Sequence, residues 1–516
     1  MKSRPPATRH RLPVFVLVPV LAALLGLVAQ PAAAPAAKPA KPAEKSKPTI
    51  FEVCRHGCRY RTIQRAVEAA GAYAFHHKGA KVTVAIRPGR YVEGVVVDGT
   101  ERKRRYDGMT IEGTKKDPRR VVLEGRNARS EFGAAQNGIE ALGVDGLVLK
   151  NLWARNYESN GFFVHATNEG DEHCGGYTMN NLRASGNRAY GLIARNCLGG
   201  KMINSVGYRQ GGSAFYVGET PCDSEEWNVY GQAPCQRKPR WTLLKDDRGY
   251  ENALGYSGAN SRYVRIIENA FYDDGTGVVS ATLDSAGQEP NGWNVIERND
   301  VFWNNYNYFL ARSAFPATSA GLGELNGQTL NYPTGVGIVI YGGDDDVVRA
   351  NRVFGNDKWG IASFSGPGET LVADEGNEAR NVNNEIVENV MGRYGSDPNG
   401  EYDIWNDDTG GGNCWGANSA NATFAPGNGK VPLSQIYPEC PQEKVGYAAV
   451  KSFNLAPGLQ IASPSKPDDP STSLGYAATD PPQNQQCSWV RRVATHPAFQ
   501  GYVPAEVTPR PGELTC

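Results

Sequence analysis

Short runs of alternating apolar and polar residues recur along the middle of the chain, usually as pairs separated by one polar residue. Alternation predicts β-strands, because successive side chains of a strand point to opposite faces. The pairs align on a shared Asn or Asp in eight units: Asn151, Asn181, Asn204, Asp246, Asn269, Asn299, Asn351 and Asn389. The tightest spacing is 23 residues, from Asn181 to Asn204. Repetition at such a period predicts a solenoid whose strands meet at corners.

Asn suits such a corner for two reasons. It tolerates the left-handed backbone conformation, and its amide can bond to an identical neighbour about 4.8 Å away in a parallel stack. We therefore expect the eight side chains to form a ladder. Five residues further on, a second polar position recurs at Asn156, Asp274, Asn304 and Asn356.

A third strand follows in most units, often after a glycine. Examples are GFFVHA from Gly161, GLIARN from Gly191, GVVSAT from Gly277, GIVIYG from Gly337 and GIASFS from Gly360. Three strands per unit predict an all-β protein, a right-handed three-sided parallel β-helix. A β-sandwich also has short strands, but it would not repeat the same corner residue over eight units.

The segment before the repeats contains TIQRAVEAA and then KVTVAIRPGRYVEGVVVDG, within residues 62–99. It resembles the opening of pectin-lyase-like β-helix proteins, in which a capping helix leads into the first coil. Apolar residues at Ile63, Ala66 and Ala69 have helical spacing. The resemblance covers about residues 49–410 and implies the fold. It implies little about chemistry, because this superfamily includes lyases, hydrolases, esterases, epimerases, binding proteins and copper-site maturation proteins.

The two ends of the chain differ from the repeats. Residues 1–37 have a basic start, an apolar run and then small residues, which is the order of a secretory signal peptide. An uncleaved membrane anchor is the alternative. Residues 38–48 form an Ala/Pro/Lys linker. Residues 411–516 lack the repeat, so we expect a loop-rich, disulfide-stabilised cap over the end of the β-helix.

The chain has ten cysteines, and in an exported protein an even number predicts disulfides. The simplest pairing joins neighbours: Cys54 with Cys58, Cys174 with Cys197, Cys222 with Cys235, Cys414 with Cys440, and Cys487 with Cys516. Other connectivities stay open. Free thiols or metal ligands are the alternative, but no pair of C-x-x-C elements exists to hold a structural zinc ion.

Charge narrows the range of partners. The formal net charge is zero, with +7 in residues 1–48 and −7 in the rest. A mildly acidic body argues against nucleic acid as the main partner. A basic run from Arg102 to Arg105, followed by Lys115 and Lys116, is either a solvated turn or a contact for an acidic glycan.

Outward positions on the third strand are the expected place for chemistry. Counted from the glycine, the fourth position forms a row of His165, Arg195, Ala281, Tyr341 and Phe364, with Gly218 and Trp405 at matching places. Insertions near 167–176, 219–241, 284–293 and 365–383 would wall a groove beside this row. Sugar rings pack on aromatic faces, so Tyr341, Phe364 and Trp405 are the predicted substrate-binding residues. Ordinary exposure on a large sheet is the alternative.

Catalytic candidates follow from two possible reactions. A lyase needs a basic residue near carboxylates that bind calcium, and Arg195 is the best-placed basic residue, with His165 beside it. A glycoside hydrolase needs paired carboxylates, and the candidates are Asp273, Asp274, Asp344 and Asp345. Asp is also common in turns for structural reasons. The Asp, His-Gly and Arg-x-Lys set of polygalacturonases is absent, and so is the pectin methylesterase pattern.

Together these features predict a secreted or cell-surface monomer that acts on, or binds, an extracellular or envelope polysaccharide. No membrane span is expected after signal cleavage. A lyase or hydrolase is one hypothesis, and a non-catalytic glycan-binding β-helix is the other. Structural or copper-maturation roles are a third, and the seven histidines of the chain make copper handling unattractive. Calcium is the only cofactor that the sequence suggests.

Overall fold

The computed structural model describes residues 47–445 except 131–132, 167–173, 222–238, 284–289, 306–320, 326–327, 332–333, 357, 366–380, 393–397, 401, 407–409, 420–423 and 427–437. The chain divides after Lys45 into two units, and every described residue belongs to the second, Ser46–Cys516. The predicted signal peptide and most of the linker therefore lie outside the described residues. No helix among the described residues is long and apolar enough to cross a membrane.

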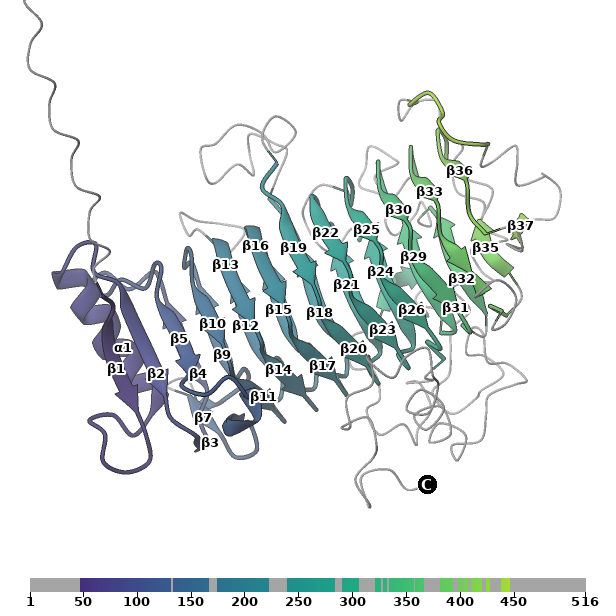
Figure 1. Ribbon diagram of the computed structural model, residues 1–516. Helices are drawn as coiled ribbons and strands as arrows, with labels where there is room; N and C mark the ends of the chain where they lie inside the picture. The colour runs from purple at the N-terminus through teal and green to yellow at the C-terminus, as the bar shows by residue number, and fades with distance from the viewer. Residues whose placement is uncertain are drawn as a thin grey trace, which may run out of the picture. The chain divides into compact units, whose positions relative to one another are not determined.

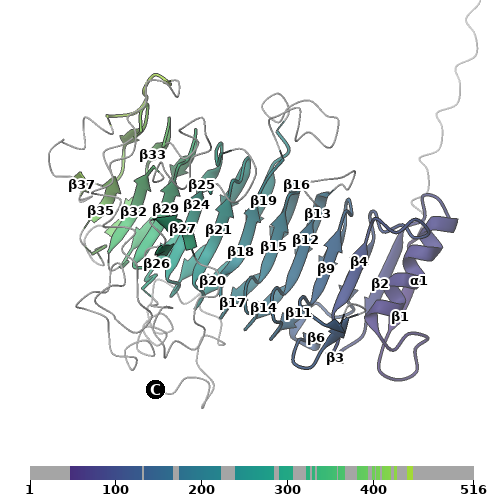
Figure 2. The ribbon, with the colours of Figure 1, turned by 180° about the vertical axis from the view of Figure 1, so that it is seen from behind.

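Three parallel sheets run along the described chain, and most coils contribute one strand to each sheet (Figures 1 and 2). Sheet A consists, in spatial order, of β1 (Thr49–Val53), β2 (Val82–Ile86), β5 (Thr110–Gly113), β10 (Val148–Lys150), β13 (Gly175–Asn180), β16 (Leu198–Ile203), β19 (Thr242–Lys245), β22 (Val264–Ile267), β25 (Val295–Glu297), β30 (Val347–Arg349), β33 (Glu385–Val387) and β36 (Cys414–Gly416). Sheet B consists of β3 (Gly89–Tyr91), β6 (Val121–Glu124), β11 (Trp153–Arg155), β14 (Arg183–Ser185), β17 (Val206–Tyr208), β20 (Arg248–Tyr250), β23 (Ala270–Tyr272), β26 (Asp300–Phe302), β31 (Arg352–Phe354) and β34 (Val390–Met391).

Sheet C consists of β4 (Val95–Asp98), β9 (Ile139–Leu142), β12 (Phe162–His165), β15 (Leu192–Arg195), β18 (Ser213–Gly218), β21 (Leu254–Ala259), β24 (Thr276–Ala281), β29 (Val336–Tyr341), β32 (Trp359–Phe364), β35 (Tyr402–Asn406) and β37 (Phe424–Pro426). The remaining elements are α1 (Ile63–His76), a 3₁₀ helix at Pro118–Arg120, and two antiparallel hairpins, β7 (Arg129–Ser130) with β8 (Gly133–Ala134) and β27 (Gly321–Leu325) with β28 (Gln328–Asn331). The prediction of a three-sided parallel β-helix behind a capping helix is confirmed.

At the corner between sheets A and B, two successive residues share what was expected of one Asn. One adopts the left-handed backbone conformation, and the other forms the ladder. Each corner has two residues: the first is left-handed and the second points inward. In the early units Asn151, Asn181, Asn204 and Asp246 occupy the left-handed place, with φ between 52° and 59°. In the later units that place belongs to Glu268, Arg298, Ala350 and Glu388, and the Asn comes second. The predicted alignment of eight Asn and Asp residues is therefore wrong by one position for its first four members.

The inward corner position carries the ladder. Asn299 Oδ1 accepts hydrogen bonds from the backbone N (2.9 Å) and Nδ2 (3.0 Å) of Asn269, and Asn351 Oδ1 accepts the same pair from Asn299. Nδ2 of Asn299 also donates to the carbonyl of Ile266 at 2.8 Å. The ladder continues through Asn389 to Asn418. Leu182 and Leu152 fill the same place in the earliest units, so that end of the corner is apolar.

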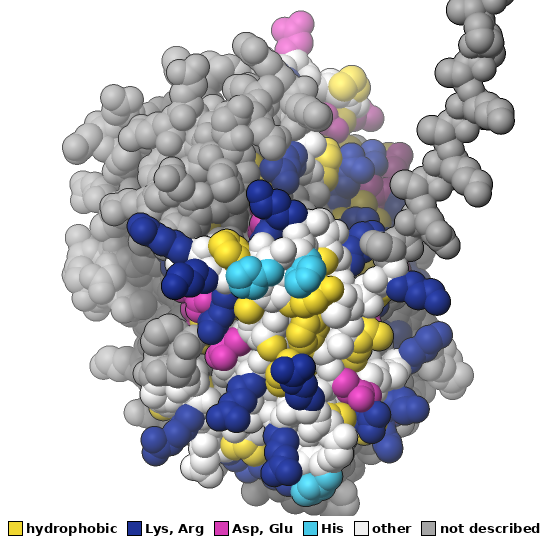
Figure 3. Space-filling model, turned by 90° about the vertical axis from the view of Figure 1, so that its left-hand side faces the viewer, with side chains coloured by type: hydrophobic (Ala, Val, Ile, Leu, Met, Phe, Trp, Pro, Cys, Tyr) yellow, Lys and Arg dark blue, Asp and Glu magenta, His cyan; other side chains and the backbone are white. Residues whose placement is uncertain are grey.

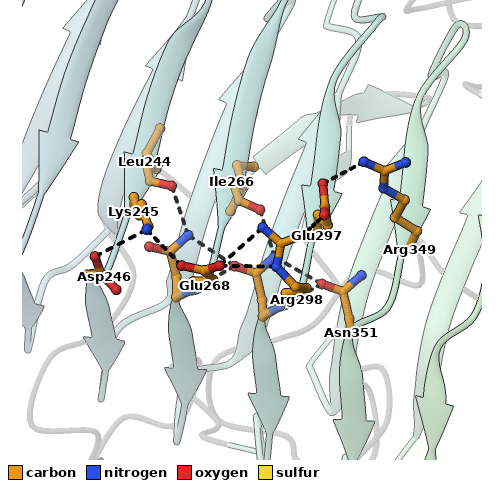
Figure 4. A network of polar contacts seen from close by, with 11 residues as sticks. Leu244, Lys245, Asp246, Ile266, Glu268, Glu297, Arg298, Arg349 and Asn351 are labelled. Atoms are coloured by element: carbon orange, nitrogen blue, oxygen red, sulfur yellow. Dashed lines mark hydrogen bonds and ion pairs between the residues drawn. The ribbon is translucent and has the colours of Figure 1, made fainter.

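Outside this corner, charged side chains bridge successive coils (Figure 4). Glu268 Oε2 lies 2.8 Å from Lys245 Nζ, Glu268 Oε1 lies 3.1 Å from Arg298, and Glu297 Oε2 lies 2.8 Å from Arg349. Most of these side chains are partly solvated, so each pair adds little to stability. We interpret the network as surface pairing of neighbouring coils.

Only glycine fits at the start of the third strand, and the reason is steric. A Cβ on Gly161 would lie 2.7 Å from the carbonyl oxygen of Gly191, and one on Gly337 would lie 2.6 Å from that of Gly360. Gly138, Gly255 and Gly277 show the same approach to the next coil. The main chains of successive coils are therefore too close for a side chain at this place.

The repeat extends beyond residue 410, where the sequence suggested it ends. Strand β36 continues sheet A, and Asn413 and Asn418 continue two of the corner ladders. Three predicted disulfides are confirmed: Cys54–Cys58, Cys174–Cys197 and Cys414–Cys440. The predicted pairs Cys222–Cys235 and Cys487–Cys516 lie outside the described residues.

Helix α1 closes the first coil and takes its N-terminal cap from a distant residue. Thr62 makes no side-chain cap, but Glu93 Oε1 and Oε2 accept hydrogen bonds from the backbone N of Ile63 (3.0 Å) and of Gln64 (3.1 Å). A carboxylate here also suits the positive end of the helix dipole.

Replacing Glu93 with Ala should therefore destabilise the first coil by about 1–2 kcal/mol, the usual cost of a lost helix cap. Thermal unfolding followed by circular dichroism measures the loss. Glu158→Ala, which removes an exposed carboxylate, is the control and should leave the transition unchanged. An equal shift in both variants would contradict the capping role.

Candidate functional site

The outer face of sheet C brings four polar side chains together over four successive strands. They are Glu140 on β9, His165 on β12, Arg195 on β15 and Glu219 directly after β18. His165 and Arg195 face each other in register, and Arg195 is in register with Gly218. The predicted row of outward residues is thus confirmed at this end of the sheet. We call Glu140, His165, Arg195 and Glu219 the sheet C cluster.

His165 is held on two sides. Its Nε2 lies 3.2 Å from Glu140 Oε1, and its ring stacks on Phe163 with the centroids 4.0 Å apart. Glu140 also accepts a hydrogen bond from Asn137 Nδ2 at 2.7 Å. The hydrogen bond from His165 lowers the pKa of Glu140, so this carboxylate stays ionised and orients the ring. A carboxylate-oriented imidazole is suited to general acid–base catalysis.

Arg195 forms the second pair of the cluster. Its Nε lies 2.7 Å from both carboxylate oxygens of Glu219. Burial raises the pKa of Glu219, and the hydrogen bond from Arg195 partly offsets this increase. Burial alone would lower the pKa of Arg195, but the contact with Glu219 raises it overall. A guanidinium that is always protonated cannot accept a proton, so the role of base predicted for Arg195 is unsuited to it. It can neutralise an anionic group.

Rings and aliphatic side chains lie beside the cluster. Phe163, Ile193 and Tyr216 are in register on β12, β15 and β18, and the rings of Tyr190 and Tyr216 are 5.0 Å apart. Phe163 and Tyr190 are partly exposed. The face therefore combines charged groups with aromatic surface, as sugar-binding sites do.

The aromatic residues predicted to bind substrate lie further along sheet C and are buried. Tyr341 and Phe364 are in register, as expected, but they are 1% and 3% exposed. Trp405 is also 3% exposed and is paired with Ala362, outside the predicted row. All three pack in one apolar cluster with Trp359 on the outer face. Outward direction on a strand does not ensure exposure, so the expected exposure of these rings is wrong.

The predicted carboxylate pairs do not meet. Asp273 and Asp274 precede β24 at the corner of sheets B and C, whereas Asp344 and Asp345 follow β29 at the corner of sheets C and A. Strands β24 and β29 are neighbours of six residues each, so the pairs lie at opposite strand ends, about 20 Å apart. Asp345 pairs with Lys444. These four residues cannot form one glycosidase pair.

Asp274 is a member of the second corner ladder and is buried. Its Oδ1 accepts hydrogen bonds from the backbone N and Nδ2 of Asn252, both at 2.8 Å, while Oδ2 has no partner. At the same place Asn304 presents an NH₂ group, which donates to the carbonyl of Phe271. Burial raises the pKa of Asp274 well above its usual value. The sequence correctly places Asp274 at a recurring corner. Its structural role in the ladder there accounts for its presence without a catalytic role.

Asp274→Asn should supply the missing donor and stabilise the protein at neutral pH by about 1–3 kcal/mol. Because the folded-state pKa is raised, the folded protein holds a proton that the unfolded chain releases above about pH 4, so stability falls as pH rises. Thermal unfolding between pH 4 and 8 should show a shallower fall in the variant. Asp246→Asn, at an exposed left-handed corner, is the control. A steeper fall in Asp274→Asn would contradict this account.

Metal binding finds no support in the described part of the chain, where no three His, Cys, Asp or Glu side chains gather as a metal site requires. Most of the insertions expected to wall a groove lie outside the described residues. Calcium remains a prediction.

Glu140 is not among the residues predicted from the sequence. The signal was present, because GIEALG from Gly138 has the same glycine-led form as GFFVHA and places Glu140 two residues after the glycine. Extending the alignment by one unit would have placed Glu140 in register with Phe163, on the same strand as His165.

No family model matches the chain, and no curated protein matches it. Solved structures do resemble it. The A-module of the mannuronan C-5 epimerase AlgE4 from Azotobacter vinelandii is 14% identical, with 70% of this chain and 91% of that one covered, at a TM-score of 0.43. An alginate lyase from Paenibacillus sp. str. FPU-7 is 11% identical, with 73% and 97% covered, at 0.33. The catalytic domain of a GH87 alpha-1,3-glucanase is 11% identical, with 76% and 69% covered, at 0.33. Likenesses this distant do not bear on the chemistry of this chain.

Proposed function

We propose that the protein is an extracytoplasmic enzyme that acts on a uronate-containing polysaccharide at the sheet C cluster. The observation that carries the proposal is the neighbouring placement of a carboxylate-oriented imidazole and a guanidinium on one outer face, beside partly exposed rings. Disulfides between described cysteines are compatible with an oxidising compartment.

The division of roles follows from the charges. His165 transfers the proton, and the hydrogen bond to Glu140 fixes the orientation of its ring. Arg195 offers positive charge to a sugar carboxylate, which would replace one of its contacts with Glu219. If His165 removes the proton next to a sugar carboxylate that Arg195 neutralises, the glycosidic C–O bond on the adjacent carbon can break. This leaves a double bond in one sugar, and the departing oxygen takes up a proton from His165 or water. We therefore favour a lyase over a hydrolase.

The alternative is a glycan-binding protein without catalysis. It is favoured by one observation: each cation of the cluster already has a carboxylate partner, as in a purely structural pair. Retention of a glycan without any product would identify this function.

The test is to incubate the purified protein with uronate-containing and neutral polysaccharides, with and without calcium. We expect unsaturated products, detected by ultraviolet absorbance, from at least one polyuronate. New reducing ends without unsaturation would indicate a hydrolase. Neither product and no retention across a broad panel would count against both functions.

A further inference from the structure

The N-terminal end of the solenoid carries exposed apolar side chains inside a ring of cations (Figure 3). Among the described residues only three large hydrophobic side chains are exposed, and two of them lie here: Ile50 on β1, 63% exposed, and Phe75 on α1, 42% exposed. The start of β1 lies beside the turn after α1, because Thr49 N donates to the carbonyl of Lys81. Ile50 and Phe75 therefore lie on the strand and the helix that open the solenoid, at the same end of it.

Half-buried rings support this apolar area. Phe51 of β1 contacts Tyr73 of α1, with the ring centroids 5.8 Å apart, and Tyr73 stacks on His77 at 4.0 Å. The ring centroid of Phe51 also lies 6.1 Å from that of Tyr60, two residues after the Cys54–Cys58 disulfide. The area is thus a fixed part of the fold.

The cations around it form no ion pair within the described part of the chain. They are Arg55, Arg59, Arg61, Arg65, Lys78 and Lys81, all exposed and all in the loop before α1, in α1 itself or in the turn after it. Arg59 also lies over the ring of Tyr60. The nearby acids are already engaged, because Glu52 pairs with Arg87 at 2.5 Å and Glu68 lies 3.9 Å from Arg104. The surface therefore keeps an uncompensated positive charge.

Charge along the chain is strongly asymmetric. Residues 49–129 hold 18 Lys and Arg against 9 Asp and Glu, whereas residues 130–516 hold 28 against 44. Directly before β1 the sequence adds Lys41, Lys45 and Lys47. An anionic surface would attract the first coils and repel the rest, which favours contact through this end.

We propose that this end docks on the surface of an anionic lipid bilayer, independently of any glycan site on sheet C. Ile50 and Phe75 enter the headgroup region, and the six cations lie against the lipid phosphates. An acidic glycan would use the cations but would gain little from an exposed isoleucine, whereas a bilayer uses both. Docked in this way, the strands that carry the sheet C cluster, β9, β12, β15 and β18, lie farther from the membrane than β4 does.

The experiment is co-sedimentation of the full chain with vesicles of phosphatidylglycerol and phosphatidylcholine in equal parts, and of phosphatidylcholine alone. Comparing the two lipids isolates the charge-dependent part of binding from insertion of the apolar N-terminal run. We expect binding to anionic vesicles to fall as salt rises, and to weaken at least about tenfold in Arg55→Glu/Arg61→Glu/Arg65→Glu. Ile50→Ser/Phe75→Ser should also weaken it while keeping the salt dependence.

The matched control is Lys115→Glu/Lys116→Glu/Arg120→Glu, the same change of charge on exposed residues between β5 and β6, outside β1, α1 and their connecting turns. Equal losses in both charge variants would overturn the proposal, since net charge alone would then explain binding. Full binding by the Ile50→Ser/Phe75→Ser variant would overturn the apolar part. If a polyuronate binds the three arginines and anionic vesicles do not, the partner is a glycan and the lipid proposal fails. Circular dichroism of each variant confirms that it is folded.

Discussion

Asn299→Ala is expected to lower the free energy of unfolding by at least about 3 kcal/mol, because it breaks the ladder in the middle of the solenoid. The change removes the acceptor of the Asn269 amide groups, the donor to the carbonyl of Ile266 and one of the donors to Asn351. Each group is buried, so water does not replace the lost partner. Chemical denaturation followed by tryptophan fluorescence measures the change.

Asn204→Ala is the matched control, since it changes an Asn at the left-handed place of the same kind of corner. Its cost should be only about 1 kcal/mol, the preference of Asn over Ala for this backbone conformation. Ala350 already occupies the equivalent place in a later coil, with φ of 54°. If both variants lose the same stability, the ladder does not contribute more than the backbone preference.

His165→Asn is expected to reduce kcat by about 10²–10⁴-fold on whichever polyuronate proves to be a substrate, because the proton-transfer group is lost. The variant should keep its fold, since His165 is partly exposed and an amide can still bond to Glu140. Product formation under saturating substrate measures kcat, and retention on immobilised glycan measures binding separately.

His56→Asn, at the exposed N-terminal end, should leave kcat unchanged and serves as the control. Glu140→Gln should lower kcat less than His165→Asn does, since it only weakens the orientation of the ring. Full activity in His165→Asn would exclude this residue as the proton-transfer group, whereas loss of glycan retention together with activity would point to a binding role.

Most of the fold could be predicted from the sequence, because a solenoid repeats its local rules. The alternation, the corner Asn and the leading glycine each report on one residue and its neighbour in the next coil. The one-residue error at Asn151, Asn181 and Asn204 arose because Asn fits both corner places, and only backbone angles distinguish them. The sequence did contain the information to avoid this error. Leu152 and Leu182 directly follow Asn151 and Asn181, and an apolar residue there marks the inward place.

The candidate site was less predictable, because it depends on what covers each face. Strand register correctly placed His165 beside Arg195, and it equally placed Tyr341 beside Phe364. The two ends of the row differ in burial: the side chains of His165 and Arg195 are accessible, whereas those of Tyr341 and Phe364 are buried. Burial depends on packing between parts of the chain that are distant in sequence, and a pattern of outward positions does not contain that information.

The glycines at the start of sheet C have a bearing on how such a chain can diverge. At Gly161, Gly277 and Gly337 the distance between coils is limited by the main chain itself, and the side chains on the outer face have no part in it. The outer face can then change its residues while the scaffold keeps its pitch. The sequence of such a chain can change until no family model matches it. The fold can still be identified from the few inward positions that the coils share.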